Sequence, residues 1–126
     1  MTDEVIASGG RFDRLLSELD QLKSECSEKG WNGYAALPAS DLSCRLAAAY
    51  ARQLPQAVSI PIPSIDNRGR AVLQWGSLGK KFLSLKFGQM QNDPVECTYG
   101  NGVELDQIEK TADDFSGLNQ IVGAYS

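Results

Sequence analysis

The chain carries carboxylates, thiols and basic side chains that could do chemistry, but none of its 126 residues is a histidine. Histidine is the side chain that most often acts as a general base near neutral pH, and it is the commonest transition-metal ligand. It is also the usual activating partner of a catalytic serine or cysteine. The composition therefore disfavours most hydrolases and metalloenzymes and favours a protein that is not an enzyme.

The densest run of carboxylates lies in the last third of the chain and consists of Glu104, Asp106, Glu109, Asp113 and Asp114. Such groups could bind a hard cation such as magnesium and support a small cation-dependent hydrolase. Their spacing, however, lacks the DxDxDG pattern of a calcium-binding loop. A solvated acidic surface near a helix N-terminus explains the same residues. We therefore expect no metal site and no cofactor.

The three cysteines, Cys26, Cys44 and Cys97, are odd in number and far apart in the chain. They form no CxxC pair, so they match neither a disulfide framework nor the spacing of a zinc site. Each stands where the local pattern calls for an apolar residue. We expect three small buried residues, with a reactive thiol as the alternative.

Charge is distributed unevenly along the chain. Residues 42–92 hold seven basic and one acidic group, whereas the segments on either side are acidic. The residues that would form a basic patch on the solvent side of a hairpin, beside Trp75 and Phe82, are Arg68, Arg70, Lys80, Lys81 and Lys86. Such a patch could bind the phosphates of a nucleic acid or an acidic protein surface.

Two observations limit this interpretation of the basic residues. Segments of opposite charge can neutralise each other in the fold, and lysines also protect sheet edges against aggregation. The isoelectric point of about 4.7 argues against a protein dedicated to nucleic-acid binding. A protein partner is therefore favoured over a nucleic acid.

A short aromatic connection, Trp31-Asn32-Gly33-Tyr34, is the second candidate contact surface. Tryptophan and tyrosine are rigid, amphipathic side chains that are enriched at interfaces. The same residues could instead close the core between two helices and a sheet. We favour the structural role, with Trp31 inside and Tyr34 nearer the surface.

The elements that must position these residues follow from the apolar pattern. Apolar residues recur every three or four positions over residues 12–29 and again over 41–54, which predicts two amphipathic helices. Ser40 is a suitable N-cap for the second helix, and Pro55 ends it. Residues 1–10 show no such period and are expected to form a loose lead-in.

Alternating apolar and polar residues predict three strands, over residues 71–75, 82–87 and 95–99, the first two of which form a hairpin. The proline-containing run 58–63 could add an edge strand but not a central one. A short C-terminal helix is expected over residues 112–125. Helices followed by strands indicate one α+β domain over residues 1–126, with two N-terminal helices on one face of a three- or four-stranded antiparallel sheet.

Nothing in the chain suggests a membrane protein. No apolar stretch approaches the roughly 20 residues that span a bilayer. The first residues, Met1-Thr2-Asp3-Glu4, are acidic where a signal peptide is basic. We expect a cytoplasmic protein.

A set of short motifs resembles those of a group of small, functionally uncharacterised bacterial and phage-borne proteins. The set comprises Trp31-Asn32-Gly33-Tyr34-Ala35-Ala36, a helix ending in Leu54-Pro55, the stretch Pro61-Ile62-Pro63 and a strand with Leu73-Gln74-Trp75. Asn32 and Ala35 stand where the pattern more often has aspartate and glycine. The resemblance covers roughly residues 31–87 and implies an α+β fold in a bacterial or mobile-element protein.

These features together favour a non-enzymatic interaction module that binds and modulates a partner protein, as antitoxin, immunity and anti-defence proteins do. The candidate partner-binding residues are Trp31, Tyr34, Arg68, Arg70, Lys80 and Lys81. Self-association into a homo-oligomer stays open. The alternatives are a nucleic-acid-associated protein that uses the basic hairpin and a cation-dependent hydrolase at the acidic C-terminal third.

Overall fold

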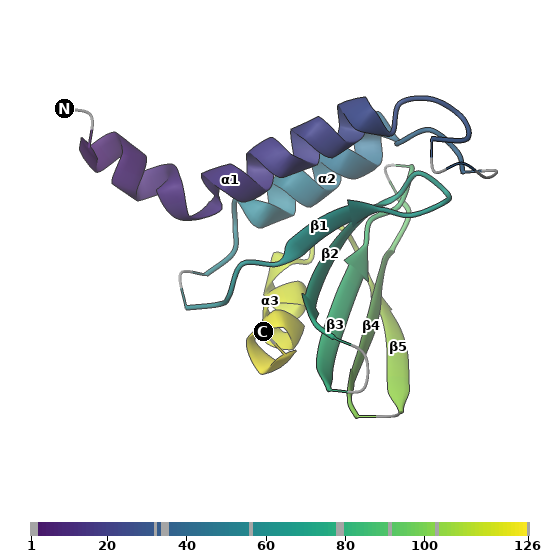
Figure 1. Cartoon of the computed structure of the whole chain (residues 1–126). Coiled ribbons are helices and arrows are strands. Elements are labelled where there is room, and N and C mark those ends of the chain that lie inside the picture. Colours follow the sequence, from purple (N-terminus) through teal and green to yellow (C-terminus); the bar gives the residue numbers. More distant parts are fainter. Residues whose placement is uncertain are drawn as a thin grey trace.

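The computed structural model of the chain describes residues 3–31, 33, 36–55, 57–77, 80–90, 92–102 and 104–125, with side chains described from Phe12 onward. Three helices and five strands occur among these residues. In chain order they are α1 (Asp3–Glu25), α2 (Asp41–Ala51), β1 (Ile62–Ile65), β2 (Ala71–Gly76), β3 (Lys81–Lys86), β4 (Val95–Asn101), β5 (Leu105–Lys110) and α3 (Phe115–Tyr125). Figure 1 shows α1 and α2 lying side by side across one end of the sheet, with α3 alongside the strands.

The strands form one antiparallel sheet in the order β1-β2-β3-β4-β5, in which each strand pairs with the next along the chain. Such a meander needs only short turns between strands. Gly69 in the first turn and Gly76 at the end of β2 have positive φ angles of 84° and 74°, a conformation that glycine adopts without steric cost. The α+β class and the antiparallel sheet agree with the prediction from the sequence.

The core lies between the helices and one face of the sheet. Alternate strand residues, among them Leu73, Leu83, Leu85 and Cys97, are fully buried there. The helices contribute Leu15 and Leu19 from α1, Ala47 and Tyr50 from α2, and Leu118 and Val122 from α3. All three helices therefore cover the same face, whereas the sequence predicted only the two N-terminal helices there.

The sheet has five strands rather than the three or four predicted. The additional strand, β5, has the sequence LDQIEK and lies at the edge of the sheet, where most of its side chains are exposed. A strand that buries neither face needs no strict apolar alternation. An edge strand does occur near the proline-containing run, but β1 spans Ile62–Ile65, so only the last two residues of the run, Ile62 and Pro63, belong to it.

The helix boundaries also differ from the prediction. Helix α1 runs from Asp3 to Glu25, so it includes residues expected to form a loose lead-in and ends before Lys29. Helix α2 begins as predicted, because the Ser40 side chain accepts a hydrogen bond from Ser43 N at 3.2 Å. It ends at Ala51, one turn short of Leu54. Within the described ranges, no helix is long and apolar enough to cross a bilayer.

Candidate functional site

The aromatic connection between α1 and α2 is tied to the body of the protein. Trp31 is half-buried against the core, and its indole Nε1 donates a hydrogen bond to the carbonyl of Leu37 at 2.7 Å. Leu37 N donates to Asn67 O at 2.8 Å, which fixes the connection to the β1–β2 turn. These contacts fix the position of the Trp31 ring in the connection. Tyr34 lies outside the described residues.

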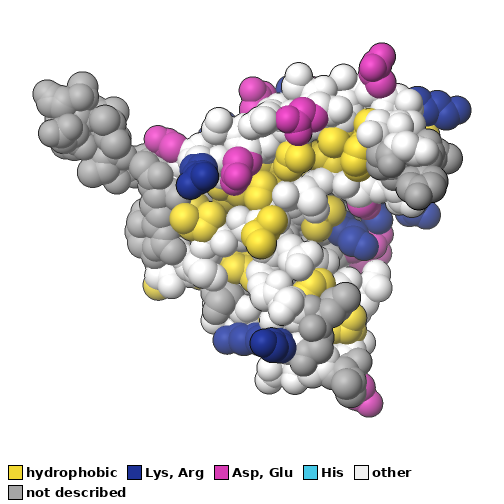
Figure 2. Space-filling model, in the orientation of Figure 1, with side chains coloured by type: hydrophobic (Ala, Val, Ile, Leu, Met, Phe, Trp, Pro, Cys, Tyr) yellow, Lys and Arg dark blue, Asp and Glu magenta, His cyan; other side chains and the backbone are white. Residues whose placement is uncertain are grey.

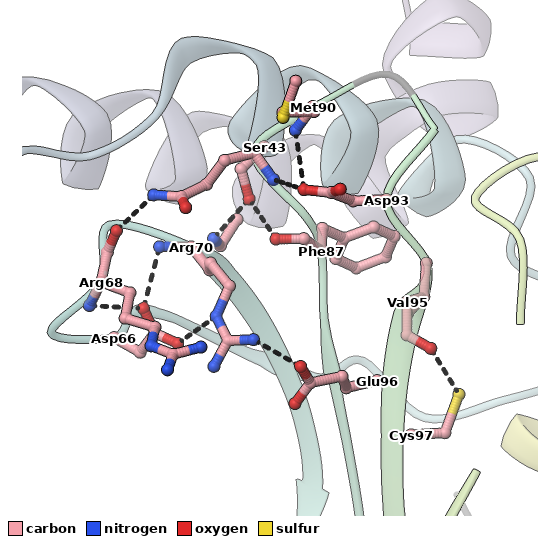
Figure 3. Close-up of polar contacts among 12 residues, drawn as sticks. Ser43, Asp66, Arg68, Arg70, Phe87, Met90, Asp93, Val95, Glu96 and Cys97 are labelled. Carbon is pink, nitrogen blue, oxygen red and sulfur yellow. Dashed lines mark hydrogen bonds and ion pairs between the residues drawn. The ribbon is translucent and has the colours of Figure 1, made fainter. Parts of the chain in front are cut away.

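Arg70 is held in an ion-pair network rather than presented to a partner. Its Nε lies 2.8 Å from Asp66 Oδ2, its Nη1 lies 2.8 Å from Glu96 Oε2, and its side chain is only 13% exposed (Figure 3). Burial alone would lower the pKa of the Arg70 guanidinium, but hydrogen bonds and charge interactions with both carboxylates raise it above its ordinary value. Arg70 thus joins the β1–β2 turn to β4 and stays charged.

Arg68 lies in the β1–β2 turn, close to Arg70 in the sequence, but its contacts differ from those of Arg70. Its backbone N–H donates to Asp66 Oδ1 at 3.0 Å, and its carbonyl accepts a hydrogen bond from the Gln89 side chain. Arg68 is exposed, and the structure gives its side chain no ion pair with a described carboxylate.

Lys80 and Lys81 lie at the opposite end of the hairpin, in the turn between β2 and β3 and at the start of β3. The six-residue strand β2 separates them from Arg68 by about 20 Å, at roughly 3.3 Å per residue. Figure 2 shows basic side chains scattered over the visible surface rather than gathered in one area. Trp75 and Phe82, predicted to lie beside the basic patch, are buried. The basic residues therefore do not form a single patch.

The acidic residues of the last third are also dispersed. Asp106 and Glu109 are an odd number of positions apart in β5, so they point to opposite faces of the sheet. Asp114 instead accepts a hydrogen bond from Gly117 N at 3.0 Å at the start of α3. Across the described part of the chain, no cluster of three or more such ligands could hold a metal ion.

The three cysteines are buried, as the sequence predicted. Burial raises the pKa of the Cys97 thiol to about 11, and it also raises the pKa values of Cys26 and Cys44. Because the thiolate is the reactive form, these thiols are poor nucleophiles near neutral pH.

A further candidate surface is the face of the sheet that points away from the helices, hereafter the open face. It comprises alternate residues of all five strands, which the pairing register aligns in rows. Its residues are Ile62, Ser64, Val72, Gln74, Phe82, Ser84, Lys86, Glu96, Thr98, Leu105, Gln107 and Glu109. Val72, Phe82 and Ser84 are buried, but they are not part of the core cluster that contains the helix residues.

The central row of the open face is a line of hydrogen-bonding side chains. Ile62 pairs with Gln74, Gln74 with Ser84, Ser84 with Thr98, and Thr98 with Gln107. The aliphatic residue at one end, Ile62, is 68% exposed, and Leu105 in the next row is 44% exposed. A depression of about 320 Å³ lies over this area. Its lining residues are Ser64, Asp66, Val72, Gln74, Phe82, Ser84, Lys86, Thr98 and Leu105.

The charged row of the open face carries both signs. Lys86 pairs with Glu96 in the strand register, and Glu96 pairs with Glu109. The Arg70–Glu96 ion pair lies beside this row. The face therefore offers paired charges, amides, hydroxyls and two aliphatic side chains, a mixture typical of the polar and apolar contacts in protein–protein interfaces.

Sequence reasoning missed the open face as a candidate site because it selected residues by charge. The signal was nevertheless present in the alternation of β2 and β3. Leu73 and Leu85 are buried on one face of the sheet, so their neighbours in the strands must point to the other face. These neighbours are Val72, Gln74, Ser84 and Lys86. What the sequence did not reveal was the fifth strand, which widens the face to Gln107.

A second cavity, of about 400 Å³, lies between α2, the β3–β4 loop and the segment before α3. Its lining includes Asp93 and Asp113 but neither a lysine nor an arginine. Asp93 Oδ2 accepts hydrogen bonds from the backbone N–H groups of Gln89 and Met90, both at 3.1 Å, and so shapes its own loop (Figure 3). The cavity lining also includes Thr111, but no hydrogen bond between the Thr111 hydroxyl and either carboxylate is recorded among the described residues.

Comparisons of the chain with models of protein families, with curated proteins and with solved structures found no match in any of the three.

Proposed function

We propose that the chain is a non-enzymatic interaction module that binds a partner protein through the open face and modulates that partner's activity. The observation that carries this proposal is a five-strand-wide face on which Gln74, Ser84, Thr98 and Gln107 are aligned in one row, with the exposed Ile62 at one end of that row and the exposed Leu105 in the next row. We further propose, from the motif resemblance, a bacterial or mobile-element protein of the antitoxin, immunity or anti-defence kind.

The composition of the open face favours a protein over a nucleic acid as the partner. Single strands bind to sheets through exposed aromatic side chains and a positively charged groove. The aromatic residue on the described part of this face, Phe82, is 7% exposed. Lys86 shares its row with Glu96 and Glu109, so the face is not basic.

Lys80 and Lys81 lie at one end of the sheet, next to the proposed surface, although Lys81 alternates with Phe82 in β3 and so points to the opposite face. They lie beside Phe82 at the start of β3, are exposed, and make no ion pair with a described carboxylate. Exposed charges at an interface rim steer association and help to select the partner. An acidic patch on the partner protein would match them.

Affinity capture from cells that contain the partner tests the proposal. We expect Thr98→Arg to abolish capture, because a long cation would interrupt the central row, while leaving the melting temperature nearly unchanged. The charge reversal Lys80→Glu with Lys81→Glu should weaken capture. Glu18→Arg, on the exposed side of α1, is the matched control and should capture as the native chain does.

Two results would count against the proposal. Equal capture by the native chain and by Thr98→Arg would show that the open face is not the binding surface. Binding of the native chain to oligonucleotides at low salt, lost as salt is raised, would favour the nucleic-acid alternative.

A further inference from the structure

We propose that the chain forms a homodimer in which two copies of β5 pair antiparallel about a twofold axis at Ile108. The pairing would join two sheets into one continuous sheet. This inference uses the backbone edge of the sheet, so it does not depend on what the open face binds.

Two backbone hydrogen bonds establish which strand groups point outward. Asp66 N donates to Arg70 O at 3.0 Å, and Phe87 N donates to Ala71 O at 2.9 Å. In an antiparallel ladder, residues that exchange hydrogen bonds alternate with residues that do not. Applied along the pairing register, this alternation shows, for each strand residue, whether its backbone N–H and C=O groups face a neighbouring strand or the free edge of the sheet.

The β1 edge is protected against strand addition. By this alternation Ile62 and Ser64 face β2, whereas Pro63 and Ile65 face outward. Proline has no backbone N–H, so Pro63 removes a donor from the free edge, and Pro61 continues the same spacing just before the strand. An added strand would find few donors there.

The β5 edge has no such protection. Asp106, Ile108 and Lys110 face β4, which leaves the backbone N–H and C=O groups of Leu105, Gln107 and Glu109 pointing outward. In the part of the chain that the structure describes, no other strand pairs with this edge, and Figure 1 shows β5 as the last strand of the sheet. An unpaired edge of this kind is a template for another strand.

The side chains of β5 fit a second copy in one register. When Ile108 lies opposite Ile108 of the second copy, Asp106 lies opposite Lys110 of that copy, and the same pair recurs across the axis. These are non-hydrogen-bonded positions, where opposing side chains approach most closely and opposite charges stabilise pairing. Gln107 and Glu109 would then exchange backbone hydrogen bonds with the second copy.

The neighbouring registers fit less well. A shift of two residues in one direction places Glu109 opposite Glu109, a pair of like charges. The opposite shift places Asp106 against Ile108 and replaces both aspartate–lysine pairs by pairs of Lys110 with Glu104, a residue that lies outside β5. Asp106 is exposed and Ile108 is half-buried at the margin of the core, so both can meet a neighbour without rearrangement of the chain. Among residues within β5, the register centred on Ile108 is therefore the one that pairs opposite charges on both sides of the axis.

A charge exchange in the full chain tests the dimer. In sedimentation equilibrium we expect the native chain to be dimeric, and Asp106→Lys or Lys110→Asp alone to raise the dissociation constant at least tenfold. The double variant should restore dimerisation. An equimolar mixture of the two single variants should form a heterodimer, because each then supplies the charge that the other lacks.

A proline substitution at a position of β5 whose backbone N–H faces outward provides an independent test of the dimer. Gln107→Pro removes an N–H that faces away from β4, so it should produce a folded monomer, whereas Gln107→Ala should stay dimeric. A native chain that is monomeric up to its solubility limit would overturn the proposal. So would a double charge variant, or a mixture of the single variants, that stays monomeric while retaining the native far-UV circular dichroism spectrum.

Discussion

At the scale of single residues, a serine hydroxyl joins the helices to the sheet. Ser43 in α2 is fully buried; its Oγ donates to Phe87 O at 2.6 Å and accepts from Ala71 N at 2.8 Å (Figure 3). Phe87 N also donates directly to Ala71 O. The other two backbone groups of this residue pair, Ala71 N and Phe87 O, are bridged by the Ser43 hydroxyl. One side chain thus completes the β2–β3 ladder and anchors α2.

We predict that Ser43→Ala lowers the free energy of unfolding by about 1–3 kcal/mol, because it leaves a buried donor and a buried acceptor without partners. Urea denaturation measures this change. Ser17→Ala, at an exposed position of α1, is the control and should change stability by less than about 0.5 kcal/mol. Equal effects of the two substitutions would show that the bridge contributes little.

The buried thiol of Cys97 makes stability depend on pH in the alkaline range. Its pKa is raised by burial from 9.0 to about 11, so the folded protein favours the neutral thiol. That stabilisation is complete below pH 9 and is lost as the pH rises through about 11. The buried hydroxyl of Tyr50, whose pKa burial also raises, acts in the same direction.

We therefore predict that the urea midpoint falls between pH 9 and about 11. It should fall less steeply in Cys97→Ala, which removes one of the groups whose pKa burial raises. An identical pH profile for the variant and the native chain would exclude Cys97 as a source of the fall.

At the scale of elements, the aromatic connection and the β1–β2 turn form one unit. Ser40 N donates to Gly69 O at 2.8 Å, so the turn also meets the N-terminus of α2. Gly69 and Gly33 both have positive φ angles, of 84° and 83°. A β-carbon at Gly69 would collide with the carbonyl oxygen of Pro38, whereas one at Gly33 would meet no atom within 4 Å.

These two glycines provide a matched comparison. Alanine at either position incurs a conformational cost of about 1–2 kcal/mol. We predict that Gly69→Ala lowers the melting temperature clearly more than Gly33→Ala, because only the former also displaces backbone. Equal losses would mean that the turn and the connection are not tightly packed together.

The elements also differ in whether the apolar pattern of the sequence could predict them. The two-residue alternation of β2, β3 and β4 was readable because each of these strands places apolar residues at alternate positions in the core, among them Leu73, Leu85 and Cys97. The edge strand β5 carries three charged residues among six and has no such period, so nothing in its sequence distinguished it from a loop. The N-terminal extension of α1 was missed because Gly9 and Gly10 disfavour a helix.

At the scale of the whole molecule, net charge along the chain was a poor guide to charge on the surface. The basic middle segment folds with Arg70 neutralised by Asp66 and Glu96, and with Arg68 and Lys81 at opposite ends of the hairpin. Spacing in the sequence does not predict these distances, because the extended strand β2 holds Arg68 and Lys81 apart. The open face emerged only once five strands were aligned.

The most direct test of the central claim is site-specific photo-crosslinking in living cells. With a photoreactive amino acid at Thr98 on the open face, the account predicts a crosslink to a different protein, identified by mass spectrometry. The same group at Glu18 on α1 should give none. Crosslinks of equal yield at both positions, or a crosslink at Glu18 alone, would contradict the claim that the open face binds the partner.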